Sequence, residues 1–135
     1  MSQQQCPFCL PNTILRGDIL HQDDLWYFVT IEDGELKHGG MAITKRHIGT
    51  PFDINTQEWA RLHELLPKFK SFIEPSGPQG FNMGWNIHTV GGQNVEHAHL
   101  HLFGRYQDEP LAGKGIRYAF KQPANKRASN SIIRD

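Results

Sequence analysis

The pattern of apolar and polar positions along the chain predicts strands around one helix. The run 25–31, Leu-Trp-Tyr-Phe-Val-Thr-Ile, is rich in aromatic and β-branched residues, which favour strands. The Asp-Gly turn within 32–35 and the run 40–44 predict a second strand that returns antiparallel to the first. Two more strands are predicted at 81–88 and 95–103.

A long helix is predicted between the second and third of these strands. Asn55 can cap its N-terminus, and Glu58, three residues later, completes a capping box. Pro67 lies inside the helical pattern and is expected to kink or divide the helix. The apolar residues at helical spacing, predicted to face the core, are Trp59, Leu62, Leu65, Leu66, Phe69 and Phe72. Strands around a helix indicate an α+β fold.

Length and charge narrow the classes of function. The chain has 135 residues, with 14 Lys and Arg against 14 Asp and Glu, so its formal net charge is zero. This balance argues against a nucleic-acid or membrane partner covering the whole surface, but it leaves room for a small anionic ligand. No apolar run approaches the roughly 20 residues of a transmembrane helix. The first five residues carry no signal-peptide pattern, so we expect a cytoplasmic protein.

The last part of the chain differs in composition from the rest. The segment 104–135 holds seven of the basic residues and three of the acidic ones. We therefore divide the chain into a domain over 1–105 and a basic C-terminal extension over 106–135. The extension is either a solvated, partly mobile tail or a segment that folds over the site and adds cations for phosphate.

Cys6 and Cys9 are the two cysteines of the chain and form a Cys-x-x-Cys pair. This spacing is typical of half a metal site or of a redox pair. A thioredoxin-like redox pair follows a strand, and only five polar residues precede Cys6, so the metal site is favoured. Redox chemistry and two unpaired thiols remain as alternatives.

The run 95–103 carries three alternating histidines, His97, His99 and His101, preceded by Gly92-Gln93-Asn94. On a strand these imidazoles would share one face, roughly 7 Å apart. An imidazole can act as a nucleophile and can bind a metal. The glycine allows backbone N–H groups to approach an anion, and Gln93 and Asn94 add side-chain amides.

The sequence Gly-Gln-Asn-Val-Glu-His-Ala-His-Leu-His-Leu-Phe at 92–103 resembles the histidine triad (HIT) family of nucleotide hydrolases and transferases. The resemblance implies an antiparallel sheet of about five strands with helices on one face, and a homodimer. It also implies that His99 is the nucleophile, that the carbonyl of His97 holds the His99 ring, and that His101 contacts the phosphoryl group. Asn86 matches an asparagine that contacts phosphate in HIT phosphoramidases.

The resemblance also implies a metal site. Some HIT proteins and the related galactose-1-phosphate uridylyltransferases bind zinc between a Cys-x-x-Cys pair, an upstream histidine and the first histidine of the triad. The matching residues here are Cys6, Cys9, His47 and His97. Two cysteines and two histidines with no open position form a structural zinc site.

Two positions depart from the family pattern. Many HIT proteins have a histidine that assists the leaving group where this chain has Gly39, and the nearest histidine is His38, one place earlier. The acid that binds ribose hydroxyls in the family aligns with Ile31, while Glu32 and Asp33 lie out of register.

The predicted function is a nucleotide hydrolase or nucleotidyl transferase with a small-molecule nucleotide substrate and a covalent nucleotidyl-His99 intermediate. Purine nucleoside phosphoramidates or similar conjugates are the preferred substrates, with dinucleoside polyphosphates as the close alternative. Two other classes remain: an enzyme whose three triad histidines bind a catalytic metal, and a nucleotide sensor without catalysis.

Overall fold

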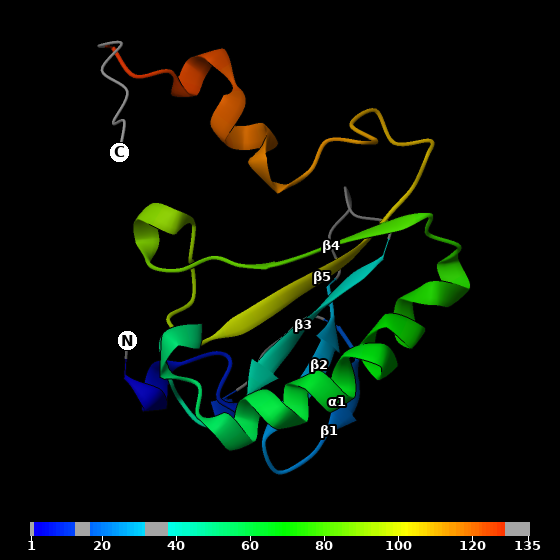
Figure 1. Ribbon diagram of the computed structural model, residues 1–135. Coiled ribbons are helices and arrows are strands. Elements are labelled where there is room, and N and C mark those ends of the chain that lie inside the picture. The colour runs from blue at the N-terminus through cyan, green and yellow to red at the C-terminus, as the bar shows by residue number, and fades with distance from the viewer. Residues whose placement is uncertain (1, 13–16, 32–37, 129–135) are drawn as a thin grey trace.

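The sheet of this protein has five antiparallel strands and one long helix on one face (Figure 1). The computed structural model describes residues 2–12, 17–31 and 38–128. In spatial order the strands are β1 (Ile19–Gln22), β2 (Trp26–Thr30), β3 (Gly39–Thr44), β5 (His99–Arg105) and β4 (Gly80–Trp85). The helix is α1 (Thr56–Ile73). The prediction of an α+β fold with about five antiparallel strands is confirmed.

The strand boundaries correct the sequence-based expectations in three places. β1 was not predicted, because its four residues are too few to show a clear alternation. β4 ends at Trp85, before the predicted limit of residue 88. β5 begins at His99, not at Val95, because the His97 amide bonds the Val95 carbonyl in a bend before the strand. The predicted turn at 32–35 lies outside the described residues.

Helix α1 begins as its capping box predicts. The Asn55 side chain accepts from the Glu58 amide at 2.8 Å, and the Glu58 carboxylate accepts from the Asn55 amide at 3.0 Å. The helix is not divided at Pro67, which is exposed within it. Trp59 is 42% exposed and therefore not a core residue, because the residue before it, Glu58, faces inward instead. The residues that α1 buries are Glu58, Leu62, Leu65, Phe69 and Ile73.

The two faces of the sheet are covered by different parts of the chain. Helix α1 covers the face on which Trp26, Phe28, Leu100 and Leu102 lie. The N-terminal segment, residues 2–12, packs its apolar side chains against the other face. That second cluster comprises Cys6, Phe8, Cys9, Tyr27, Val29 and Ile43. Because strand side chains alternate, His99 and His101 lie on the face away from α1.

The residues after β5 form an extended C-terminal arm, defined here as residues 106–128, which runs beyond the β4 edge (Figure 1). It contains two short 3₁₀ helices, η6 (Ile116–Lys121) and η7 (Pro123–Asn125). Most of its residues are exposed. Among the described residues, no helix combines the length and apolarity that a membrane span requires.

Candidate functional site

The three triad histidines do not form one row, which corrects the expectation from the sequence. His99 and His101 project from β5 onto the same face, with ring centroids 4.9 Å apart. His97 lies in the bend before the strand and is fully buried. Its ring belongs to a different cluster from the other two, so the triad divides into two functional parts.

His99 has a tautomer that its hydrogen bond determines. Its Nδ1 lies 2.6 Å from the backbone oxygen of His97, and a carbonyl can only accept. Nδ1 therefore carries the proton and Nε2 keeps its lone pair. Burial lowers the pKa of His99, more than the carbonyl contact raises it, so the ring is neutral at pH 7. Phe8 packs edge-on against this ring at 4.9 Å between centroids and limits its rotation.

The position of the proton on His101 differs from that on His99. Its Nδ1 is buried and has no hydrogen-bond partner among the described residues. A buried donor without an acceptor is costly, so the proton is better placed on Nε2, where it can be donated to a ligand. Burial, and then the neighbouring His99, lower the pKa of His101 to about 4, which keeps this ring neutral as well.

The other predicted substrate residues line two different cavities. Gly92 has a φ of +95°, a conformation that favours glycine, and a Cβ there would lie 3.6 Å from the Asn86 amide carbon. Asn86 lines a small cavity with His101. Asn94 is exposed and lines a separate cavity with Gln93 and Glu96, and the described lining of that cavity includes no triad histidine.

The Gln93 side chain makes hydrogen bonds within the protein that hold the loop before the triad in place. Its side-chain nitrogen donates to the Gly49 carbonyl at 2.6 Å and to the Val95 carbonyl at 3.1 Å. Its side-chain oxygen accepts from the His88 amide at 2.8 Å. Both amide hydrogens are thus used within the protein. The geometry favours a positioning role for Gln93 over the direct contact expected from the sequence.

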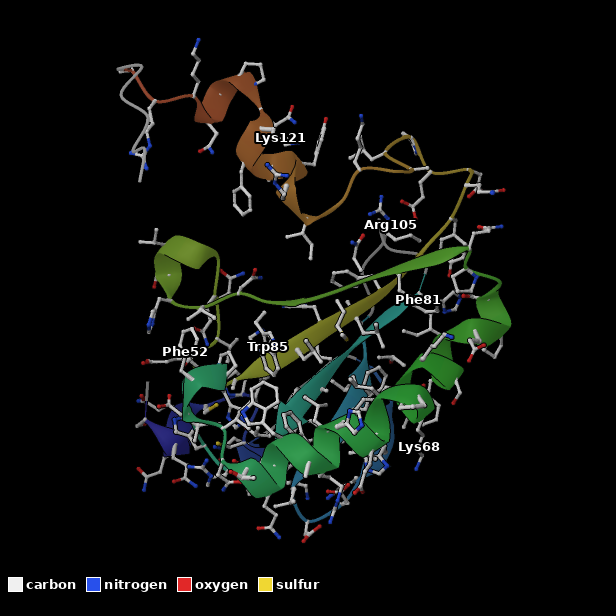
Figure 2. All side chains as sticks on the ribbon, in the orientation of Figure 1. Phe52, Lys68, Phe81, Trp85, Arg105 and Lys121 are labelled. Atoms are coloured by element: carbon white, nitrogen blue, oxygen red, sulfur yellow. The ribbon has the colours of Figure 1, made fainter. Side chains whose placement is uncertain are left out.

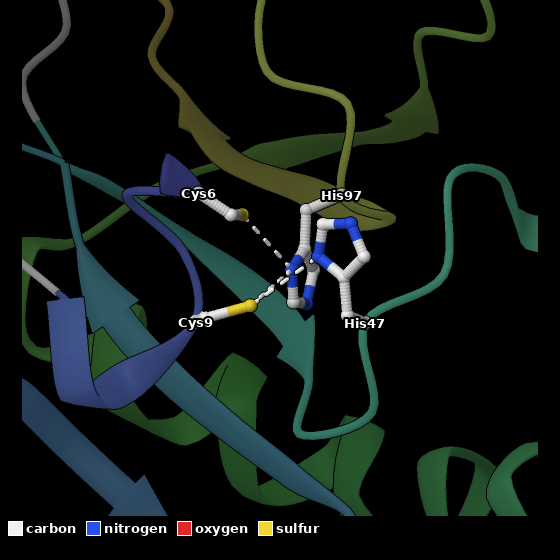
Figure 3. A group of neighbouring side chains, drawn as sticks. All are labelled: Cys6, Cys9, His47 and His97. Atoms are coloured by element: carbon white, nitrogen blue, oxygen red, sulfur yellow. Dashed lines mark hydrogen bonds between the residues drawn. The ribbon is translucent and has the colours of Figure 1, made fainter. Parts of the chain in front are cut away.

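A second cluster gathers the four predicted metal ligands (Figure 3). The ligand atoms of Cys6, Cys9, His47 and His97 all lie within 4.8 Å of one another. The sulfur of Cys6 is 3.3 Å from Nδ1 of His97, and that of Cys9 is 3.3 Å from Nδ1 of His47. Zinc–sulfur and zinc–nitrogen bond lengths in a tetrahedron place such atoms about 3.6 Å apart. The four residues lie close enough to bind a metal ion.

The tautomer of His97 fits a ligand. Its Nε2 lies 2.7 Å from the Thr44 carbonyl, so Nε2 carries the proton and Nδ1 turns its lone pair toward the two sulfurs. Burial, as the largest cause, lowers the pKa of His97 to about 4. Burial and the neighbouring Cys6 raise the pKa of Cys9 to about 11, whereas a reactive redox thiol has a lowered pKa.

A buried ion pair holds the loop that carries His47. Arg46 donates to both carboxylate oxygens of Glu58, at 2.7 and 3.3 Å, and to the Asp53 carbonyl at 2.8 Å. The Glu58 side chain is 1% exposed. Burial raises the pKa of Glu58, but the hydrogen bonds from Arg46 and Asn55 outweigh burial and lower it. The first turn of α1 therefore fixes the position of one of the four residues that could bind a metal.

The structure gives a physical reason why this chain has a glycine at position 39, with its nearest histidine at position 38, where the HIT pattern has a histidine at position 39. Gly39 pairs with Phe103, and a Cβ at position 39 would lie 2.7 Å from the Phe103 ring. Phe103 thus fills the space that a side chain at position 39 needs. His38 is exposed, and its carbonyl accepts from the Gly104 amide, so alternation turns its side chain away from the triad face. Glu32 and Asp33 lie outside the described residues.

Comparisons with known proteins agree with this geometry. No family model matches the chain. A curated relative, adenylylsulfatase HINT3 from Arabidopsis thaliana, is 26% identical over 122 residues, which cover 85% of this chain and 60% of that protein. The chain thus spans about 60% of the length of this curated relative.

Solved structures show the same fold. A HIT family hydrolase from Clostridium thermocellum superposes with a TM-score of 0.63 and 24% identity over 79% of this chain and 96% of the other. A HIT family member from Bacillus subtilis gives a TM-score of 0.67 and 23% identity, over 76% and 74% of the two chains. This chain therefore shares the fold of these HIT proteins. The HIT fold predicted from residues 92–103 is therefore confirmed.

Sequence reasoning missed several residues that position the site. Phe8 restrains His99, the Thr44 carbonyl sets the tautomer of His97, and Phe103 fills the space beside Gly39. Of these three residues, only Phe8 is noticeable in the sequence, as a large apolar residue between two cysteines. The contribution of Thr44 is made by its backbone, which no residue pattern encodes.

Proposed function

We propose that this protein is a nucleotide hydrolase or nucleotidyl transferase in which His99 becomes covalently nucleotidylated. One observation carries the proposal: Nδ1–H of His99 donates to the His97 carbonyl at 2.6 Å, which leaves Nε2 neutral and free. Splitting a phosphoryl transfer through an imidazole replaces one difficult step with two easier ones.

In the first step, the Nε2 lone pair of His99 forms a bond to the phosphorus of the nucleotide. The bond from phosphorus to the leaving group breaks, and its electron pair departs with that group. An amine takes up a proton from solvent as it leaves, whereas a phosphate or sulfate leaves as the anion. The ring then carries a positive charge, which the His97 carbonyl stabilises through Nδ1–H. In the second step, the oxygen of a water molecule or of an acceptor alcohol bonds to phosphorus. The P–N electron pair returns to Nε2, and the attacking oxygen gives up its proton to solvent.

The neighbouring groups bind and orient the phosphate in this proposal. His101 donates from Nε2 to a non-bridging oxygen, because its Nδ1 is the unprotonated atom. Asn86 and Asn94 supply side-chain amides, and Gly92 lets the backbone approach the anion. Gln93 keeps this loop in place through its bonds to Gly49 and Val95.

We further propose that the four-residue cluster binds a structural zinc ion. Two thiolates and two imidazoles form a closed donor set of the kind that tetrahedral zinc prefers. The ion would join the N-terminal segment to the bend that carries the His97 carbonyl. Since His97 belongs to this cluster and His99 is held by a carbonyl, the alternative of a catalytic metal bound by all three triad histidines is not supported.

The preferred substrates remain purine nucleoside phosphoramidates or similar conjugates, with dinucleoside polyphosphates as the alternative. Because Phe103 fills the space beside Gly39, no histidine protonates the leaving group from that position. Substrates with reactive leaving groups are therefore favoured. The remaining candidate is a nucleotide sensor without catalysis. The lack of a histidine at position 39 is the observation that favours it.

Steady-state hydrolysis of an adenosine phosphoramidate tests the proposal. We expect His99→Ala to lower kcat by at least about a thousandfold, because the nucleophile is lost. The matched control is His63→Ala, an exposed histidine of helix α1, which should leave kcat within twofold of the native value. Equal turnover in the native protein and His99→Ala would contradict the proposal.

The homodimer, the cytoplasmic location and the lack of a nucleic-acid partner stay predictions. Sedimentation of the purified protein tests the first. The exposed edge strand β4 and its exposed Met83 offer a surface for a second copy.

A further inference from the structure

The C-terminal arm forms one wall of a groove that starts at the triad. Ile116 of the arm lies over β4, where a Cβ on Gly84 would be 3.8 Å from its δ-methyl group. Gly84 pairs with His101 across the two strands. A cavity of about 200 Å³ lies between them and is lined by His101, Phe103 and Ile116. The arm therefore reaches the triad face of the sheet.

The groove continues from this cavity along the arm. A second cavity, of about 440 Å³, shares Asn82 and Ile116 with the first. Its other lining residues include three cations, Lys114, Arg117 and Lys121, and its described lining contains no acidic residue. The Lys114 ammonium lies 5.9 Å from the centre of the Tyr118 ring, which restrains it on the wall. One end of the groove is thus at the triad and the other is cationic.

Arg105 holds the arm in this position (Figure 2). Its guanidinium donates to the Glu109 carboxylate at 2.8 Å, to the Lys114 carbonyl at 2.8 Å and to the Leu111 carbonyl at 2.9 Å. It also bonds Asn82 of β4, which lines both cavities. One side chain thus joins the end of β5, the edge strand and the first turns of the arm. The charge of Glu109 is matched by Arg105, so it does not cancel the three cations farther along.

We propose that this groove binds a leaving group that carries a negative charge, such as the terminal phosphate or sulfate of a nucleotide conjugate. The proposal rests on the function proposed above and makes its substrate class more specific. A phosphate or sulfate leaves without being protonated, so it suits a site whose position 39 has no room for an acid. Cations along its path stabilise the charge that develops as the bond to phosphorus breaks.

The test compares two substrates that share adenosine and the scissile phosphorus but differ in the charge of the leaving group. Adenosine phosphoramidate has an uncharged one, and adenosine 5′-phosphosulfate has an anionic one. We expect Arg117→Ala/Lys121→Ala to lower the ratio of kcat/KM for the phosphosulfate to that for the phosphoramidate by at least about tenfold, the size of one charged hydrogen bond. The matched control, Lys126→Ala/Arg127→Ala, removes the same charge from arm residues that do not line the groove.

The control variant should leave the ratio within twofold of the native value. An unchanged ratio in Arg117→Ala/Lys121→Ala, or an equal fall in the control, would overturn the proposal. The first outcome would show that the leaving group does not reach the cations. The second would show only a general effect of net charge.

A binding measurement separates failure of the groove from failure of the proposed function. Calorimetry with inorganic pyrophosphate requires no turnover at His99. Weaker binding by about tenfold in Arg117→Ala/Lys121→Ala, but not in the control, would support the groove even if no substrate is hydrolysed. Equal affinity in all three proteins, or no binding to the native protein, would overturn it whatever His99 does.

Discussion

The N-terminal segment and the C-terminal arm both reach the triad face of the sheet, where Phe8 lies against His99 and Ile116 lines a cavity with His101, but they are held in different ways. The N-terminal segment is buried: Cys6 is fully inaccessible, Phe8 packs on His99, and the Tyr27 hydroxyl donates to the Phe8 carbonyl at 2.5 Å. The C-terminal arm is mostly exposed. It is anchored by hydrogen bonds from Arg105 and, at its start, by those of Tyr106 with Ser76 and of Gln107 with Gln79. From this comparison we expect the N-terminal segment to hold the proposed nucleophile in place, and the arm to act on the choice of substrate.

Removal of the metal ligands should have the largest effect, because it releases the buried segment. A ligand present at a thousandfold excess over its Kd stabilises the folded state by about 4 kcal/mol. We expect Cys9→Ser to lose bound zinc and most of this stabilisation, as measured by elemental analysis and by urea unfolding. His63→Ala is the control and should keep both. Full stability without metal in Cys9→Ser would show that the segment is held by packing alone.

The buried ion pair beneath His47 should have the next largest effect. Glu58→Ala leaves Arg46 without its carboxylate and removes half of the capping box. The expected loss is about 3 kcal/mol in the free energy of unfolding, the sum of the charge-assisted hydrogen bonds to Arg46 and of half the capping box, while the half-exposed Arg46 is rehydrated. Urea unfolding measures it. Glu64→Ala, an exposed acid of the same helix, should change stability by less than about 0.5 kcal/mol.

Acid should lower the stability of the protein through Asp23, which lies between β1 and β2, away from the N-terminal segment and the arm. Burial raises the pKa of Asp23, but hydrogen bonds from Leu25, His21, Trp26 and Arg61 outweigh it and lower the pKa from 3.8 to about 2. Since the folded pKa is the lower one, this stabilisation is complete above pH 4 and is lost as the pH falls to 2. The contribution is on the order of 2 kcal/mol.

Unfolding followed between pH 5 and pH 2 should therefore show a smaller pH dependence in Asp23→Asn than in the native protein. Asp108→Asn, an exposed carboxylate of the arm, is the matched control and should follow the native profile. Identical profiles for the native protein and Asp23→Asn would contradict the assignment.

Deletion of the part of the arm that follows Ala112 should have the smallest effect on stability. A chain that ends at Ala112 keeps the bond between Arg105 and Glu109 and removes only exposed or partly exposed described residues. We expect the Tm to fall by less than about 4 °C, which corresponds to under about 1 kcal/mol. Calorimetry measures it. A larger fall would show that the arm is part of the folded core and would remove the contrast between the two ends.

The sequence predicts most of the fold because its local signals agree with the packing. The β-branched run in β2, the capping box at Asn55 and the apolar stripe of α1 each form the predicted element. β1 escaped prediction because its pairing with β2 stabilises it more than its own composition does. The split of the triad was missed because a hydrogen bond between the His97 amide and the Val95 carbonyl forms a bend, so that the strand alternation starts only at His99.

The candidate site is predictable where it depends on residue identity and not where it depends on backbone atoms. The four candidate metal ligands were named from the resemblance, and the structure brings them together. The Thr44 carbonyl that sets the tautomer of His97 carries no sequence signal, and the His97 carbonyl that holds His99 was expected only through the resemblance. The position of the arm depends on the bonds of Arg105, which only three-dimensional proximity reveals.

The central claim is that His99 carries the nucleotide, and intact-protein mass spectrometry after brief mixing with adenosine phosphoramidate tests it most directly. We predict that the native protein gains the mass of one adenylyl group, that peptide mapping places it on His99, and that His99→Ala gains none. An adduct of equal yield in His99→Ala, or turnover by the native protein without any adduct, would contradict the account.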